Sequence, residues 1–102
     1  MSDVQDIVDR FAENCDAGGV VYPSVVSEKT GLSFLDVYHC LSNRNDFYEM
    51  LEPYCDSCGR FSGIWFNAFW EIRGEFVCPH CGKTIDNAAG DAVIVFRKNR
   101  QS

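Results

Sequence analysis

Long apolar runs are absent from this chain of 102 residues, and basic residues are scarce, with 9 Lys and Arg against 15 Asp and Glu. No apolar segment approaches the roughly 18 residues that a membrane-spanning helix needs. The chain starts MSDVQDIVDRF, which lacks the basic region and apolar run of a signal peptide. We therefore expect a cytoplasmic protein with no membrane partner, whose cysteines serve as thiols or metal ligands rather than as disulfides.

Familiar catalytic arrangements are also missing. The sequence has no glycine-rich phosphate loop and no pair of carboxylates in an apolar setting. Cys15 and Cys40 stand on apolar helical faces, where we expect buried thiols, and a nucleophilic cysteine would need an activating neighbour. His39 precedes Cys40 on the same helix and so faces elsewhere. We therefore expect neither an enzyme nor a small-molecule substrate.

The composition is that of a folded protein, with 46% hydrophobic and 24% charged residues. Its charge is unevenly spread along the chain. Residues 1–53 hold 3 basic and 10 acidic side chains, for a formal charge of −7, whereas residues 54–102 hold 6 basic and 5 acidic ones, for +1. Because an acidic segment repels phosphate, the first half is poorly suited to nucleic acid.

The first half has the pattern of three helices. Apolar residues of DVQDIVDRFAENC recur at three- and four-residue steps, and two glycines end that segment. A second short helix is expected from Pro23, because proline suits a first helical turn, and Gly31 ends it. Ser33, with Asp36 three residues later, resembles a capping box that opens a third helix over LDVYHCLSNR.

This order of elements is typical of a helix-turn-helix, and VVSEKTGLSFLDVYHCL resembles that family. One residue departs from the pattern, since Arg44 stands where such helices usually carry a core leucine. The following DFYEML is expected to form a strand or wing in which Phe47 supplies the missing packing. We assign residues 1–53 to this winged-helix-like domain; a plain three-helix bundle fits the same periodicity.

Two near-copies of one phrase, CDSCGR and CPHCGK, stand in the second half with 19 residues between their cysteine pairs. Each C-x-x-C presents two thiolates from one tight turn, and zinc prefers four tetrahedral ligands. We therefore expect a zinc ribbon with one structural zinc per chain; His80 is expected to face solvent. Rubredoxin-like iron binding is the rival, because four thiolates also suit iron. The predicted ligands are Cys55, Cys58, Cys78 and Cys81.

The segment between the cysteine pairs is unusually aromatic. If residues 61–72 form one strand, alternate side chains face opposite ways. The face with Ile64, Phe66, Trp70 and Ile72 is then the core of the ribbon, and Phe61, Trp65 and Phe69 share the opposite face. A small ribbon cannot cover both faces. Either the helical domain covers the second face, with the C-terminal strand AVIVF pairing alongside, or that face binds another chain.

A helix-turn-helix followed by a zinc ribbon resembles the architecture of the general transcription factor E alpha subunit. That family acts as a non-enzymatic adaptor at the polymerase and promoter. The fold expected here is α+β, with a three-helix unit followed over residues 54–102 by a zinc ribbon and a C-terminal strand. We expect an adaptor or regulator that binds a protein, or a second copy of itself. Its expected partner-binding residues are Leu35, Tyr38, Phe61, Trp65 and Phe69.

Two alternatives stay open. In the first, the third helix enters a major groove and the protein regulates a promoter, although the acidic first half makes phosphate contacts hard to assemble. We accordingly expect nucleic acid binding to be weak and salt-sensitive. In the second, the four cysteines bind iron and the protein carries electrons. The residues that would contact nucleic acid are His39, Asn43, Arg44, Arg97, Lys98 and Arg100.

Overall fold

The computed structural model describes residues 3–72 and 75–99, and the chain divides into two compact units. The helical unit is formed by the chain up to Glu49 and again from Val95, and the ribbon unit is Met50–Ile94. Helices and short antiparallel strands together confirm the expected α+β class. The ribbon is thus inserted within the sequence of the helical unit, whereas we expected it to follow that unit over residues 54–102.

The three helices of the described chain begin and end close to the predicted positions. Pro23 opens the second helix, and Gly31 ends it in the left-handed region at φ 78°. Ser33 caps the third helix, because its Oγ accepts a hydrogen bond of 3.1 Å from the N–H of Asp36. None of these helices is long and apolar enough to cross a membrane. Their bounds are α1 Asp3–Asn14, α2 Pro23–Thr30 and α3 Phe34–Ser42.

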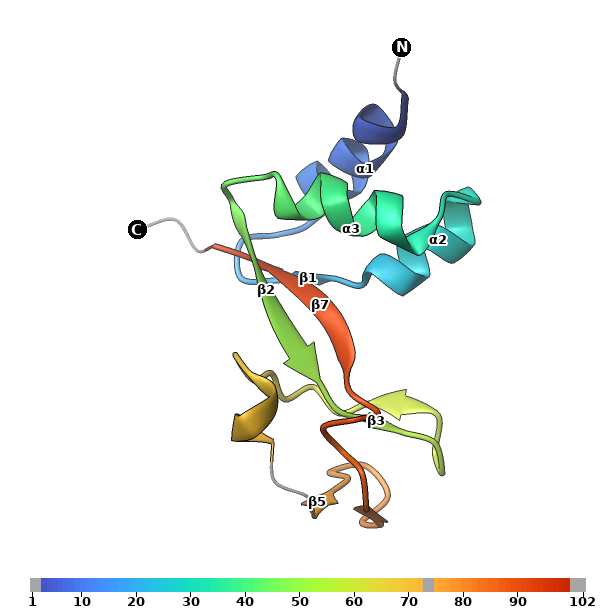
Figure 1. Ribbon diagram of the computed structural model, residues 1–102, viewed down its shortest axis with the longest axis vertical. Helices are drawn as coiled ribbons and strands as arrows, with labels where there is room; N and C mark the ends of the chain where they lie inside the picture. The colour runs from blue at the N-terminus through green and yellow to red at the C-terminus, as the bar shows by residue number, and fades with distance from the viewer. Residues whose placement is uncertain (1–2, 73–74, 100–102) are drawn as a thin grey trace. The chain divides into compact units, whose positions relative to one another are not determined.

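The helical unit also contains part of a three-stranded sheet, since it includes β1, β2 as far as Glu49 and β7 from Val95. The strand order of this sheet is β1-β7-β2, so β7 lies between the other two. Figure 1 shows β2 and β7 as the two long strands of this sheet. The expected C-terminal strand therefore exists, but it pairs with β1 and β2 rather than with residues 61–72. The strands are β1 Val20–Val21, β2 Phe47–Glu52 and β7 Val93–Lys98.

The core of the helical unit is apolar and closed to water. Helix α3 packs against both α1 and α2, and Val8, Val37 and Leu41 have no exposed surface. Phe96 of β7 is buried in the same unit, and Phe47 is buried as predicted. Burial of such side chains stabilises a fold by roughly 1.5–3 kcal/mol each, so this unit has a conventional hydrophobic core.

The ribbon unit is built from two short hairpins. Tyr54 pairs with Phe61 in the first, and Phe76 pairs with Ile85 in the second. Leu51, Ile72 and Ile85 form a small apolar core together with two of the cysteines. The hairpin strands are β3 Tyr54–Cys55, β4 Arg60–Phe61, β5 Phe76–Val77 and β6 Thr84–Ile85.

The prediction of one continuous strand over residues 61–72 is wrong. β4 ends at Phe61, and the chain then turns at Gly63, whose φ of 78° is incompatible with an extended strand. A short 3₁₀ helix, η1 Phe69–Glu71, follows. Trp70, which we placed on the core face, is consequently 86% exposed. A turn and a helical segment interrupt the alternation of side chains that a continuous strand would show.

Candidate metal centre

Each C-x-x-C pair lies in a turn that its following glycine allows. Gly59 and Gly82 have φ values of 69° and 78°, a conformation that residues with a Cβ rarely adopt. The N–H of Gly59 donates to the carbonyl of Cys55 at 2.8 Å, and that of Gly82 donates to Cys78 at 2.9 Å. Both turns therefore bend the chain back on itself, so that each presents its two sulfurs on one side.

The four predicted ligands converge. The sulfurs of Cys55 and Cys81 are 3.6 Å apart and those of Cys58 and Cys78 are 3.7 Å apart. All four lie within 4.8 Å of one another. A disulfide bond is about 2.05 Å long, so these are free thiols. A tetrahedral ion with metal–sulfur bonds of about 2.3 Å needs sulfurs about 3.8 Å apart. The cluster therefore fits one metal ion.

The electrostatics of the cluster favour a bound cation. Burial and hydrogen bonds with Cys55 and Cys78 raise the pKa of Cys58 to about 12. Burial also acts to raise the pKa of Cys78, but hydrogen bonds from the backbone N–H groups of Cys81 and His80 outweigh it and lower the pKa to about 6. Four thiols this close cannot all ionise on their own, because their negative charges repel. A metal cation removes that barrier by binding the thiolates.

The surroundings of the cluster are uneven. Cys55 and Cys78 are buried, Cys58 is half-buried and Cys81 is exposed. His80 is exposed, as we predicted, but its ring is engaged: Nε2 lies 3.0 Å from the carbonyl oxygen of Phe61, to which it donates. The histidine thus joins the second cysteine turn to the first hairpin. An all-sulfur tetrahedral set suits zinc or iron.

The predicted partner-binding residues fall into two groups. Leu35 on α3 and Phe69 in η1 are 60% and 56% exposed. Tyr38 is half-buried, and its hydroxyl donates to Glu49 at 2.7 Å. Phe61 is half-buried against the ring of Tyr54. Of these side chains, only Leu35 and Phe69 therefore have enough exposed surface for a large apolar contact.

Trp65, the residue on which we placed most weight, does not face outward. It is half-buried, and its indole N–H donates to Oε1 of Glu52 at 3.0 Å. Glu52 is completely buried, and its other oxygen accepts from the N–H of Gly63 at 2.6 Å. Sequence reasoning missed Trp70 and Val77, which are exposed instead. Gly63 was the available signal, because a glycine inside a predicted strand marks a break.

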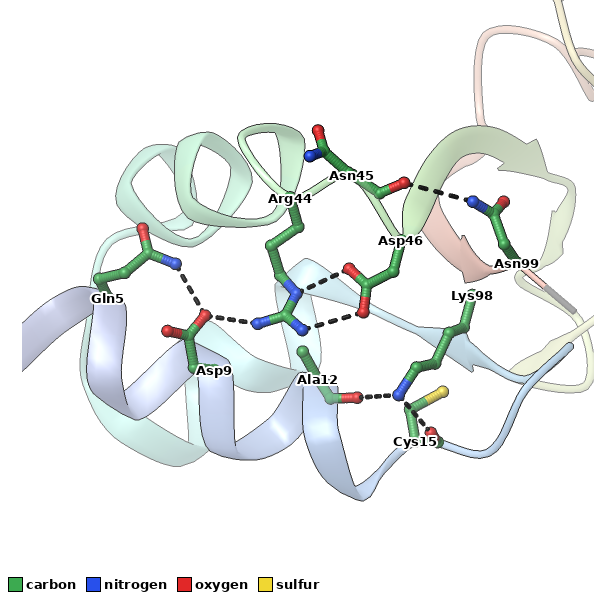
Figure 2. Close-up of polar contacts among 9 residues, drawn as sticks. All are labelled: Gln5, Asp9, Ala12, Cys15, Arg44, Asn45, Asp46, Lys98 and Asn99. Atoms are coloured by element: carbon green, nitrogen blue, oxygen red, sulfur yellow. Dashed lines mark hydrogen bonds and ion pairs between the residues drawn. The ribbon is translucent and has the colours of Figure 1, made fainter. Parts of the chain in front are cut away.

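The predicted nucleic-acid residues are also divided. His39 and Asn43 are exposed on the helical unit. Arg44 is not: its guanidinium binds Asp9 at 2.7 Å and Asp46 at 2.9 Å, and its side chain is 19% exposed (Figure 2). Hydrogen bonds from Arg44 lower the pKa of Asp46. Arg44 therefore joins α1 to the start of β2 instead of presenting its charge to solvent.

The other predicted cations hold the helical unit together. Nζ of Lys98 donates to the carbonyls of Ala12 and Cys15 at 3.0 Å each (Figure 2). Helix α1 has no basic residue in its last turn, so Lys98 supplies the positive charge that its C-terminal end favours. Nε of Arg97 donates to the carbonyl of Gly18 at 3.2 Å. Arg100 lies outside the described residues.

The two cysteines outside the cluster behave as ordinary thiols. Cys40 is buried in the core of the helical unit, as expected, whereas Cys15 is half-buried just after α1. Burial raises the pKa of both. A raised pKa disfavours the thiolate, which is the reactive form.

Comparison of the chain with family models, with curated proteins and with solved structures found no match. The resemblance to the general transcription factor E alpha subunit therefore gains no support from relatives.

Proposed function

We propose that this protein is a non-enzymatic zinc-binding adaptor or regulator. Zinc folds the ribbon unit, and exposed apolar side chains bind a protein partner. The observation that carries the metal assignment is the convergence of four sulfurs within 4.8 Å on two glycine-containing turns. Closed sites of four cysteines from two C-x-x-C turns are typical of structural zinc. Bound zinc would supply folding free energy on the order of 10 kcal/mol.

Protein is proposed as the partner in preference to duplex DNA because cations are lacking where DNA would need them. Helix α3, FLDVYHCLS, contains no lysine or arginine. The nearest cation, Arg44, already binds two carboxylates. Duplex binding depends on several lysine or arginine contacts with phosphates. The exposed positions of α3 include Phe34 and Leu35, which suit an apolar contact.

The charge of each structural unit supports the same choice. The helical unit contains 6 basic and 9 acidic residues, and the ribbon unit contains 3 and 6. Each unit therefore has a formal charge of −3, and together they account for the −6 of the chain. The basic excess in residues 54–102 disappears, because Arg97, Lys98 and Arg100 belong to the helical unit. A net negative charge on each unit disfavours nucleic acid.

Both units expose large apolar side chains. Phe34 and Leu35 are neighbours at the start of α3, and Phe69 and Trp70 are neighbours in η1. Aromatic side chains are enriched in protein interfaces, and tryptophan is enriched among the residues that contribute most of the binding energy. We name the first pair the α3 surface and the second the η1 surface. Each is a candidate contact with a protein.

Affinity capture with matched variants tests the adaptor function. Leu35→Glu places a charge on the α3 surface, and Ser42→Glu places the same charge on an exposed polar position of the same helix. We expect Leu35→Glu to reduce capture of one identified partner at least tenfold, and Ser42→Glu to leave capture unchanged. Trp70→Glu makes the same test on the η1 surface. Leu35→Glu and Trp70→Glu should both keep the wild-type melting temperature, since exposed side chains contribute little to folding.

A DNA titration tests the alternative function, that of a DNA-binding regulator. We expect a labelled duplex to bind no more tightly than about 10⁻⁴ M at physiological salt, the weak end of non-specific binding. Preferential binding of one duplex sequence, lost in His39→Ala or Asn43→Ala, would replace the adaptor with a DNA-binding regulator. Capture that is equally strong for wild type, Leu35→Glu and Trp70→Glu would reject both proposed surfaces.

A further inference from the structure

Strand β1 lies at one end of the three-stranded sheet. Its neighbour is β7, and no strand in the described part of the chain pairs with its other edge. Edge strands offer unpaired N–H and C=O groups to any extended segment that reaches them.

The register of β1 against β7 determines which main-chain groups of β1 point outward. The N–H of Lys98 donates to the carbonyl of Gly19 at 2.8 Å, and the N–H of Gly18 donates to the carbonyl of Lys98 at 2.9 Å. Two residues of one strand thus oppose one of the other, which is a β-bulge. From this point Val20 opposes Arg97 and Val21 opposes Phe96.

Hydrogen-bonded and non-hydrogen-bonded pairs alternate along an antiparallel ladder. Because Gly19 accepts from Lys98, the pair Val20 and Arg97 is non-hydrogen-bonded, and the pair Val21 and Phe96 is hydrogen-bonded. The N–H and C=O of Val20 therefore point away from β7. Those of Val21 point toward it. The outer edge of β1 thus presents one donor and one acceptor, both from Val20.

A groove lies beside this edge. It has a volume of about 410 Å³ and is bounded by the end of α1, by β1 and by α2. Val25 is exposed there, although it is apolar. Asp16 and Lys29 add one charge of each sign to the lining. Its apolar lining includes Phe11, Cys15, Val20, Val21, Val25 and Val26.

We propose that this edge of β1 binds an extended segment of a partner protein by strand addition. The occupant is a short segment whose main chain bonds the N–H and C=O of Val20. Its apolar side chain fills the groove, and a charge on either side of that residue faces Asp16 and Lys29. This inference rests on the proposed adaptor function and names a second, independent contact for the partner.

The directionality of the groups selects this kind of occupant. An outward N–H and C=O on one residue match the main chain of a strand, and an adjacent pocket matches its alternate side chains. A helix satisfies its own main-chain groups and would leave those of Val20 unpaired. A second copy of this chain is the competing occupant, since two β1 edges could pair with each other.

Proline scanning separates the two edges of β1. Val20→Pro removes an N–H that points away from β7, and proline is tolerated on an edge strand in that orientation. Val21→Pro removes an N–H directed at β7 and should lower the melting temperature. Val20→Thr keeps both the N–H and a β-branched side chain, and so serves as the matched control.

The probe is a random nonapeptide library displayed on phage and selected on the full, zinc-loaded chain. The best peptide is synthesised with a fluorophore and titrated by anisotropy. We expect it to carry an apolar residue between charged flanks. Val20→Pro and Val25→Glu should each weaken its binding at least tenfold at unchanged zinc content. Val20→Thr should bind it as wild type does.

Amide exchange provides a second readout that does not depend on any substitution. Binding of the peptide should slow hydrogen exchange at the N–H of Val20. If Val20→Pro fails to fold, this measurement decides alone: protection of Val20 supports the proposal, and unchanged exchange overturns it.

Three outcomes would overturn the proposal. The library could return no binding peptide, or a peptide that binds Val20→Pro as well as wild type. Alternatively, the wild type could sediment as a dimer and Val20→Pro as a monomer, which would assign the edge to a second copy. The adaptor function has its own control, because Leu35→Glu affects the α3 surface alone. If Leu35→Glu no longer binds the partner while Val20→Pro still binds it, the adaptor function is supported and the proposed β1 site is rejected.

Discussion

The two units of this chain are stabilised in different ways. The helical unit buries side chains from all of its helices and from β7, and it satisfies its helix ends with Ser33, Gly31 and Lys98. The ribbon unit has a smaller core, in which Cys55 and Cys78 take the place of apolar residues. Small units that cannot bury enough apolar surface depend on metals or disulfides. We infer that apolar burial holds the first unit and metal holds the second.

Loss of a metal ligand should have the largest effect and should fall on one unit only. We expect Cys58→Ser to release zinc and unfold the ribbon unit, because the proposed metal would supply on the order of 10 kcal/mol there. Both tryptophans lie in that unit, so their fluorescence reports on it selectively, while far-UV circular dichroism reports mainly on α1, α2 and α3.

The control for that experiment is Cys15→Ala, which removes a thiol of the helical unit. It should leave zinc content and tryptophan emission unchanged. Retention of one zinc by Cys58→Ser, or loss of zinc from Cys15→Ala, would mean that the ligands are assigned wrongly.

A core truncation in the helical unit should produce the reverse pattern. Leu41 is completely buried, and replacing such a leucine with alanine costs about 2–5 kcal/mol. We therefore expect Leu41→Ala to lower the melting temperature seen by circular dichroism, with zinc content and tryptophan emission preserved. If both signals are lost in a single transition, the two units fold together and the comparison fails.

Within the ribbon unit, the two tryptophans should differ. Glu52→Leu removes the acceptor of two partly buried hydrogen bonds, from the indole N–H of Trp65 and the N–H of Gly63, and such a bond contributes about 0.5–1.5 kcal/mol. Glu52→Leu should also shift tryptophan emission. Trp70→Ala should change stability by less than about 0.5 kcal/mol, because the residue is exposed. Equal losses in the two variants would show that the turn at residues 62–66 does not depend on Glu52.

The ion pairs of the helical unit should contribute less to stability than the metal site or the buried Leu41. We expect Arg44→Met to cost about 1 kcal/mol, since the pairs with Asp9 and Asp46 are partly exposed. The pKa of Asp46 is lowered in the folded state, so its contribution is present above the ordinary aspartate pKa of about 3.9 and is lost as pH falls through the folded value. Urea unfolding at pH 7 and pH 3 should therefore show a smaller difference between wild type and Arg44→Met at pH 3. A constant difference would exclude the linkage.

Local signals account for what could be predicted from the sequence. Pro23, Gly31 and Ser33 act on their own turns of helix, and each C-x-x-C-G defines its own turn. These features need no knowledge of distant residues. The helices and the convergence of the four cysteines follow from them.

Non-local pairings account for the features that could not be predicted from the sequence. The pairing of Val21 with Phe96 joins residues far apart in sequence, so the insertion of the ribbon between β2 and β7 left no local mark. Glu52 likewise accepts from Trp65, which turns a residue assigned to an interface into part of the ribbon's own structure. Arg44 looked available for a partner because Asp9, which pairs with it, lies on α1, far away in the sequence.

Native mass spectrometry combined with elemental analysis of the purified chain tests the central claim most directly. The account predicts one zinc per chain, bound with all six cysteines reduced, and no zinc after Cys58→Ser. Visible absorption with bound iron would contradict the assignment of zinc. A metal-free chain with disulfides among Cys55, Cys58, Cys78 and Cys81 would contradict the claim that metal holds the ribbon unit.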